Sequence, residues 1–130
     1  MDLSGFNFSE NSDKGVEVVL RHPVTDEPLD IKVTVVGSDS KRYKAASHRV
    51  QNRSLSRGRG KITAERLEAN GLEILSECVL DWENVEDSEL FDEVPKCNKE
   101  NVLKFLKKHT WAKEQIDSFI ADRSNFLASA

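Results

Sequence analysis

The sequence lacks any apolar run approaching the ~20 residues that span a bilayer. Its first residues, MDLSGFNFSENSDKG, contain neither an apolar stretch nor a small-residue cleavage site, so we expect no export by such a signal. Cysteine is scarce too, and Cys78 and Cys97 lie too far apart for a CxxC redox or zinc motif. Two cysteines in a chain of 130 residues form no disulfide framework, so we expect reduced thiols in a cytoplasmic protein.

Signatures of catalysis are missing as well. The three histidines, His22, His48 and His109, belong to no HExxH motif, metal-ligand spacing or Ser/His/Asp arrangement. The acid-rich stretch DWENVEDSELFDE has no glycine, which the twelve-residue calcium loop requires at its centre. We therefore predict no enzyme, no cofactor and no metal site, and we interpret the acid-rich stretch as a solvated loop.

The charged residues are strongly segregated along the chain. The formal net charge is -4 and the pI about 5.4, which argues against general affinity for DNA or anionic membranes. The segment from Lys41 to Lys61 contains eight Lys or Arg residues and no carboxylate. The segment from Glu65 to Glu93 contains eleven acids, with Arg66 as its only base. A basic block is thus followed directly by an acidic one.

The basic block is not a phosphate loop, because Lys61 is followed by Ile62 where a P-loop needs Ser or Thr. Tyr43 is its only aromatic residue, whereas binding of single-stranded nucleic acid gains from several aromatic side chains on which bases stack. Besides nucleic-acid binding, two interpretations are open: a solvated helix whose charge is balanced by the acidic helix after it, or a docking face for an acidic or amphipathic protein. The candidate contact residues of that docking face share one helical face and are Arg42, Arg49 and Arg53.

Alternating apolar residues predict two strands near the start of the chain. GVEVVLR and LDIKVTVVG place Val and Ile on one face, and the intervening HPVTDEP has the composition of a turn. We therefore predict a β-hairpin over residues 15–36. Residues 1–14 are too polar to support a core, and we predict that they form a flexible tail.

Helical spacing and capping residues predict four helices after the hairpin. The expected N-caps are Ser38 or Ser40, then Thr63, Asn98 and Thr110. The predicted fold class is α+β, mainly α, with the hairpin and about four helices in one compact domain over residues 15–127. The helices are expected at about residues 39–57, 63–80, 98–109 and 111–127.

Aromatic residues supply further candidates for partner contact. Trp82 and Trp111 are the only tryptophans, and tryptophan is enriched at interface hot spots, although core packing is its more common use. The segment SGFNFSE in the expected tail offers Phe6 and Phe8, which could fold onto a groove or sheet edge of this or another chain. We predict partner binding for these four residues together with the three arginines.

Three short patterns add to this order of features. They are Asp-Trp-Glu at residues 81–83, the polar cap with Glu before an apolar helix at residues 98–102, and a Trp with a following Gln-Ile and a closing Asn-Phe. The residues of this last pattern are Trp111, Gln115, Ile116, Asn125 and Phe126. With these patterns, the chain from about Gly15 to Leu127 resembles the tail assembly chaperones of long-tailed bacteriophages.

The resemblance implies a non-enzymatic role in the cytoplasm of an infected bacterium. Such proteins bind the long helical tape measure protein, keep it soluble, and are displaced as tail tube proteins assemble around it, so that they are absent from the finished virion. A longer form made by ribosomal frameshifting often accompanies the short one, and self-association is left open. Two other classes stay as alternatives: a structural tail or head-tail joining protein of the virion, and a nucleic-acid-binding regulator that uses residues 41–61.

Overall fold

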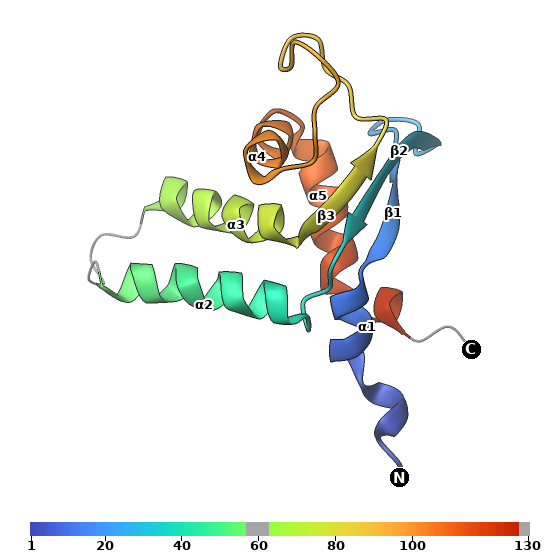
Figure 1. The fold of residues 1–130 in the computed structure, drawn as a ribbon, viewed down its shortest axis with the longest axis vertical. Helices are drawn as coiled ribbons and strands as arrows, with labels where there is room; N and C mark the ends of the chain where they lie inside the picture. The colour runs from blue at the N-terminus through green and yellow to red at the C-terminus, as the bar shows by residue number, and fades with distance from the viewer. Residues whose placement is uncertain (57–62, 128–130) are drawn as a thin grey trace.

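The structure is a computed structural model that describes residues 1–56 and 63–127. Its centre is an antiparallel sheet of three strands, in the order β1 (Val16–Arg21), β2 (Pro28–Val35) and β3 (Val79–Glu83). Among the described elements, helices pack on one side of this sheet and leave the other side open, and the broad α+β class predicted from the sequence is confirmed (Figure 1).

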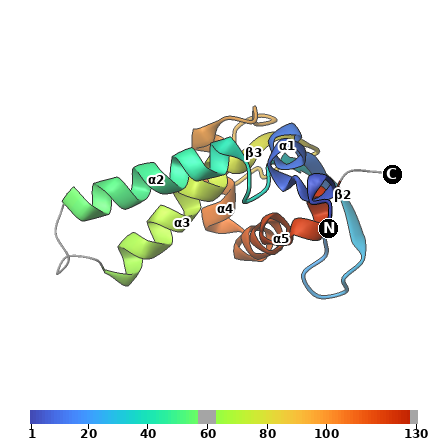
Figure 2. The ribbon, with the colours of Figure 1, turned by 90° about the horizontal axis from the view of Figure 1, so that it is seen from below.

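The helices divide into an arm and a body. The arm consists of α2 and α3, which lie side by side and project away from the sheet (Figures 1 and 2). The body contains α4 and α5, which lie beside the sheet, and α1, which lies near the C-terminal end of the chain (Figure 1). The bounds are α1 (Phe8–Lys14), α2 (Lys41–Ser56), α3 (Ala64–Cys78), α4 (Lys99–Lys108) and α5 (Thr110–Ala121), with short 3-10 helices η1 (Ser4–Phe6) and η3 (Arg123–Phe126).

Three of the predicted caps are confirmed by backbone N–H groups that donate to them. Ser40 Oγ accepts from Tyr43 N at 3.0 Å at the start of α2. Thr63 Oγ1 and Asn98 Oδ1 do the same for α3 and α4, at 3.2 and 2.9 Å. The prediction for Thr110 is wrong, because α5 includes Thr110 and its cap position is taken by His109, without a side-chain hydrogen bond.

The alternating pattern of the first two strands also predicts which of their side chains are buried. Val18, Leu20, Val33 and Val35 are buried, and β1 pairs with β2 in the register Val16 to Val35 and Val18 to Val33. These side chains join α3, α4 and α5 in one hydrophobic core. None of the helices in the described part of the chain combines the length and apolar character needed to cross a bilayer.

The third strand was not predicted. The sequence predicts a helix over residues 63–80 followed by a loop, whereas α3 ends at Cys78 and β3 begins at Val79. Pairing with β2 explains the difference, because Val33 lies opposite Trp82 and Thr34 opposite Asp81. The predicted hairpin is therefore two strands of a larger sheet, which stabilises strands better than an isolated pair.

The expectation of a flexible tail over residues 1–14 is also wrong for its second half, because residues 8–14 form α1. Ser12 is buried, and its carbonyl accepts from Gly37 N at 3.2 Å. The Asp13 carboxylate accepts from Lys41 N at 2.7 Å. Contacts with distant residues, which composition alone does not reveal, order this polar segment.

The last predicted helix, over 111–127, is divided in two. The α5 helix stops at Ala121, and Asp122 Oδ1 then accepts hydrogen bonds from the backbone N and the hydroxyl of Ser124, at 3.0 and 2.6 Å. Such local side-chain bonds compete with helix continuation. The turn that follows inserts Phe126 into the core, where it is 1% exposed.

Candidate partner-binding surface

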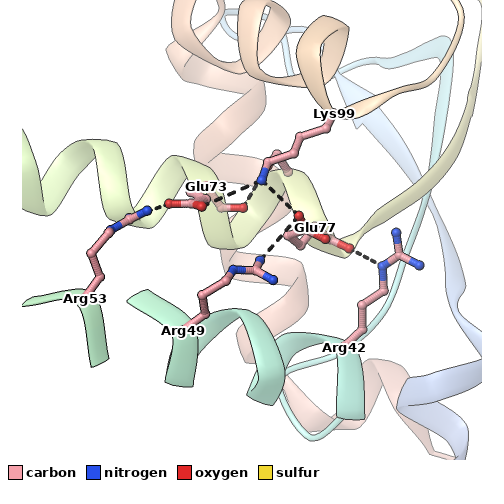
Figure 3. Close-up of polar contacts among 7 residues, drawn as sticks. Arg42, Arg49, Arg53, Glu73, Glu77 and Lys99 are labelled. Atoms are coloured by element: carbon pink, nitrogen blue, oxygen red, sulfur yellow. Dashed lines mark hydrogen bonds and ion pairs between the residues drawn. The ribbon is translucent and has the colours of Figure 1, made fainter. Parts of the chain in front are cut away.

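The three candidate arginines of α2 point toward α3 (Figure 3). Arg53 Nη2 lies 2.6 Å from Glu73 Oε2, and Arg49 Nη2 lies 3.4 Å from Glu77 Oε1. Arg42 donates from Nε to the Glu77 carbonyl. The candidate docking face is therefore occupied, at least in part, by contacts within the chain.

A lysine from α4 completes this network (Figure 3). Lys99 Nζ lies 3.1 Å from Glu77 Oε1 and 3.7 Å from Glu73 Oε1. The hydrogen bond from Arg53 is the main cause that lowers the pKa of the Glu73 carboxyl below its usual value. We call these residues the α2–α3 ion-pair network: Arg42, Arg49, Arg53, Glu73, Glu77 and Lys99.

For these arginines, the network agrees with the interpretation that the acidic helix balances the charge of the basic one. Docking of a partner on the same face stays a prediction. Reversing the three arginine charges would disrupt the contact between α2 and α3, so it is not a clean test of partner binding. The predictions that concern residues 57–62 lie outside the described residues.

Trp82 has a structural position. Its indole Nε1 donates to the Pro95 carbonyl at 3.1 Å, and its ring meets Phe105 edge to face, with centroids 5.6 Å apart. The bond ties the loop that follows β3 to the sheet. Trp82 therefore follows the more common use of tryptophan, in packing.

The aromatic contacts continue from Trp82 toward Trp111. His109 lies between Phe105 and Trp111, with ring centroids 5.3 and 6.0 Å away. His109 Nε2 also lies 2.8 Å from Asp87 Oδ2. The spacing of Phe105 and His109, four residues apart, indicates part of this connection, whereas the contact of Trp82 with Phe105 forms only on folding.

Asp87 holds the acidic loop against the end of α4. Its carboxylate is 2.8 Å from Lys108 Nζ as well as from His109, and it accepts from Glu89 N at 3.0 Å. The hydrogen bonds from Lys108 and then His109 lower the pKa of this carboxyl well below its usual range. The acidic stretch, predicted as a solvated loop, is thus anchored at one point by a half-buried aspartate.

Trp111 lines an open groove between β1 and α5. The groove has a volume of about 560 Å³ and presents Val19, which is 41% exposed, opposite Trp111 and Phe119. Gln115 pairs its side-chain amide with the backbone of Arg21, accepting from N and donating to O, both at 2.8 Å. We call this the β1–α5 groove; its lining is Val18, Val19, Arg21, Pro23, Asp26, Trp111, Glu114, Gln115, Ser118 and Phe119.

The two phenylalanines of the N-terminal segment differ in their surroundings. Phe6 closes η1 and is 56% exposed, whereas Phe8 begins α1 and is half-buried. Leu3 is exposed as well. Apolar side chains therefore remain exposed near the N-terminus. Among the described contacts, none joins Phe6 or Phe8 to the candidate tryptophans or arginines.

Thiol and metal chemistry find little support in the described residues. Burial raises the pKa of the Cys78 thiol to about 12 and that of the Cys97 thiol to about 11, so neither is a reactive thiolate at neutral pH. Within residues 1–56 and 63–127, no three His, Cys, Asp or Glu side chains are placed to hold a metal ion together.

Comparison with known protein families, with curated proteins and with solved structures found no match to this chain. Its function therefore has to be argued from its own residues. Among the candidate residues, Trp111 lines a solvent-open groove with both apolar and polar side chains.

Proposed function

We propose that this protein is a tail assembly chaperone of a long-tailed bacteriophage. In this role it binds the tape measure protein in the host cytoplasm and keeps it soluble until the tail tube assembles around it. The proposal starts from the sequence resemblance over residues 15–127. Several residues that carry this resemblance also make defined contacts: Trp82 bonds Pro95, Asn98 caps α4, Gln115 pairs with the Arg21 backbone, and Asn125 donates to the Phe119 carbonyl.

The observation that best supports partner binding is the β1–α5 groove. A tape measure segment that waits for its tube exposes apolar helical stripes, which aggregate unless they are covered. Trp111 and Phe119 from α5 and Val19 from β1 form an apolar surface that could cover part of such a stripe. Aromatic side chains suit this task because they contribute large contact areas with few rotatable bonds.

Release is as necessary as binding in this role. The groove is shallow and open, so each apolar contact is incomplete, and charged residues such as Glu114 lie at its margin. Charge at an interface margin raises the association rate more than it slows dissociation. Many weak contacts of this kind would allow a partner to be held and then displaced by tail tube subunits.

Co-expression with the tape measure protein encoded near this chain tests the proposal. We expect the otherwise insoluble partner to become soluble and to co-elute in size-exclusion chromatography. A Val19→Asp variant should lower the co-eluting yield, because it places a charge within the groove. Val24→Asp is the matched control, since Val24 is 85% exposed in the β1–β2 turn and is not among the groove residues.

Failure of the wild-type chain would first direct the test to the longer frameshifted form, if one is encoded. Failure with that form as well would overturn the chaperone proposal. Detection of this chain in purified virions by mass spectrometry would then favour the structural tail or head-tail joining role. DNA affinity that falls steeply with salt would favour a nucleic-acid-binding regulator.

A further inference from the structure

A second groove lies on the other side of α5 from Trp111, where α3, α4 and α5 meet. Its volume is about 300 Å³, and all of its lining comes from helices or the junction between them. Ala69, Leu72 and Leu106 supply its apolar part, and the last two are almost fully buried. We call it the α3–α4–α5 groove; its remaining lining is Glu65, Glu68, Lys107, Thr110 and Lys113.

The charges of this groove are separated by sign. Glu65 and Glu68 lie on α3, whereas Lys107 ends α4 and Lys113 lies in the first turn of α5. None of these four side chains forms an ion pair with another residue of the described part of the chain. The groove therefore has an acidic wall and a basic wall that do not neutralise each other by direct contact.

We propose that the α3–α4–α5 groove binds an amphipathic helix of the tape measure protein. The helix would place small or aliphatic side chains over Ala69 and Leu72, Lys or Arg beside the acidic wall, and Asp or Glu beside the basic wall. The choice of the tape measure protein rests on the proposed function above, whereas the chemistry of the helix follows from the charge complementarity of the two walls.

The lining favours a helix over an extended strand. A strand binds by adding to a sheet edge, which offers free backbone N–H and C=O groups. The α3–α4–α5 groove offers side chains from three helices, whose ridges pack with the ridges of another helix. The two oppositely charged walls would also fix the direction of the bound helix, because turning it end for end would exchange its acidic and basic flanks.

A designed peptide tests the groove without the tape measure protein. The probe is a fluorescein-labelled helix of about 20 residues with an Ala/Leu ridge, Lys on one flank and Glu on the other. A control peptide keeps the ridge and replaces both flanks with Gln. At 50 mM salt, we expect the charged peptide to bind the full chain about tenfold more tightly than the control peptide, because several ion pairs at the groove rim contribute. This difference in affinity should vanish at about 500 mM salt, where the charges are screened.

Protein variants locate the binding. Glu65→Gln combined with Glu68→Gln removes the acidic wall, and Lys107→Gln combined with Lys113→Gln removes the basic wall. Each pair should weaken binding of the charged peptide and leave that of the Gln-flanked peptide unchanged. Glu27→Gln combined with Glu93→Gln is the net-charge control for the acidic-wall pair, because both acids are exposed and lie outside this groove.

Loss of tape measure co-elution on removing either wall, with the control pair unaffected, would confirm the assignment in the setting of the proposed function. Equal affinity for the two peptides, or equal losses in the control pair, would overturn it.

Failure of the groove assignment and failure of the proposed function give different results. If the chain binds the charged peptide but not the tape measure protein, the groove assignment stands and the proposed function fails. If a variant without both walls still solubilises the tape measure protein, the proposed function stands and the groove assignment fails.

Discussion

The α3 helix carries two pairs of acids on two faces, and the structure treats them differently. Glu73 and Glu77 meet cations from α2 and α4 at distances down to 2.6 Å. Glu65 and Glu68 line a groove opposite two lysines, without an ion pair among the described residues. On one face of α3, the acids thus hold the helix to its neighbours. On the other face, the acids bind a partner in our proposal.

The difference follows from position along and around the helix. Glu73 and Glu77 are four residues apart in the second half of α3, where α2 and α4 both pack against it. Glu65 lies in the first turn, where a carboxylate is also favoured by the helix dipole. The lesson is that a count of acids in a helix does not reveal their role, which depends on the cations that folding brings near each face.

Among the changes to the two faces of α3, reversal of the Glu73 charge should have the largest effect on folding stability. Glu73→Lys places a cation among Arg53, Arg49 and Lys99, so we expect a loss of roughly 2–3 kcal/mol and a fall in Tm of about 10 °C. Circular dichroism during heating measures this. Combining Glu73→Lys with Arg53→Glu should recover part of the loss; a double variant no more stable than the single one would show that the pair itself contributes little.

Low pH should weaken the α2–α3 ion-pair network and so lower the stability of the folded protein. Arg53 lowers the pKa of Glu73 in the folded state, so the unfolded chain binds more protons in the acid range. The resulting stability is present above about pH 4.3, the ordinary value for Glu, and is lost as the pH falls toward the folded-state pKa. Tm measured from pH 6 to pH 3 should therefore fall less steeply in Glu73→Gln than in the wild type. Parallel curves would contradict this origin of the acid sensitivity.

Removal of the α3 cap should have an intermediate effect and should act on both faces at once. Thr63→Ala deletes the oxygen that accepts from Arg66 N, at a cost of about 1 kcal/mol. Urea unfolding measures the change. Ser88→Ala, at an exposed loop position, is the control and should stay within about 0.5 kcal/mol of the wild type. An equal loss in both variants would argue against a specific role for the cap.

Reversal on the groove face should have the smallest effect on stability. Glu65→Lys combined with Glu68→Lys removes a favourable first-turn charge but breaks no described ion pair, so we expect a loss below about 1 kcal/mol. The same thermal measurement applies. A loss as large as that of Glu73→Lys would erase the distinction between the two faces and show that both are structural.

The sequence predicts the elements whose signals are local. Period-two alternation located β1 and β2, and the hydroxyl or amide oxygens of Ser40, Thr63 and Asn98 marked three helix starts. Each of these features depends on a few neighbouring residues. The same holds for the shared face of the arginines on α2, although their partners on α3 and α4 were not identified individually.

The missed features depend on contacts between distant residues. The β3 strand forms because β2 offers it a free edge, and its sequence VLDWE continues directly from a helix without a break. The anchoring of Asp87 by Lys108 and His109 joins a loop to the end of a later helix. The sequence analysis did not predict the α3–α4–α5 groove, because its lining comes from three helices that only folding brings together.

Gly37 has a consequence for how the chain reaches its final state. A Cβ at this position would lie 2.7 Å from Ser12 Oγ and 3.0 Å from the ring of Phe126, so two segments from the first third of the sequence meet one that follows about 90 residues later. Contacts between residues so far apart in sequence close large loops and form slowly. During synthesis, the ribosome releases Phe126 long after α1 and the first two strands have emerged. The junction at Gly37 therefore stays incomplete until Phe126 has left the ribosome, and we expect it to become ordered after the contacts within α1 and between the first two strands.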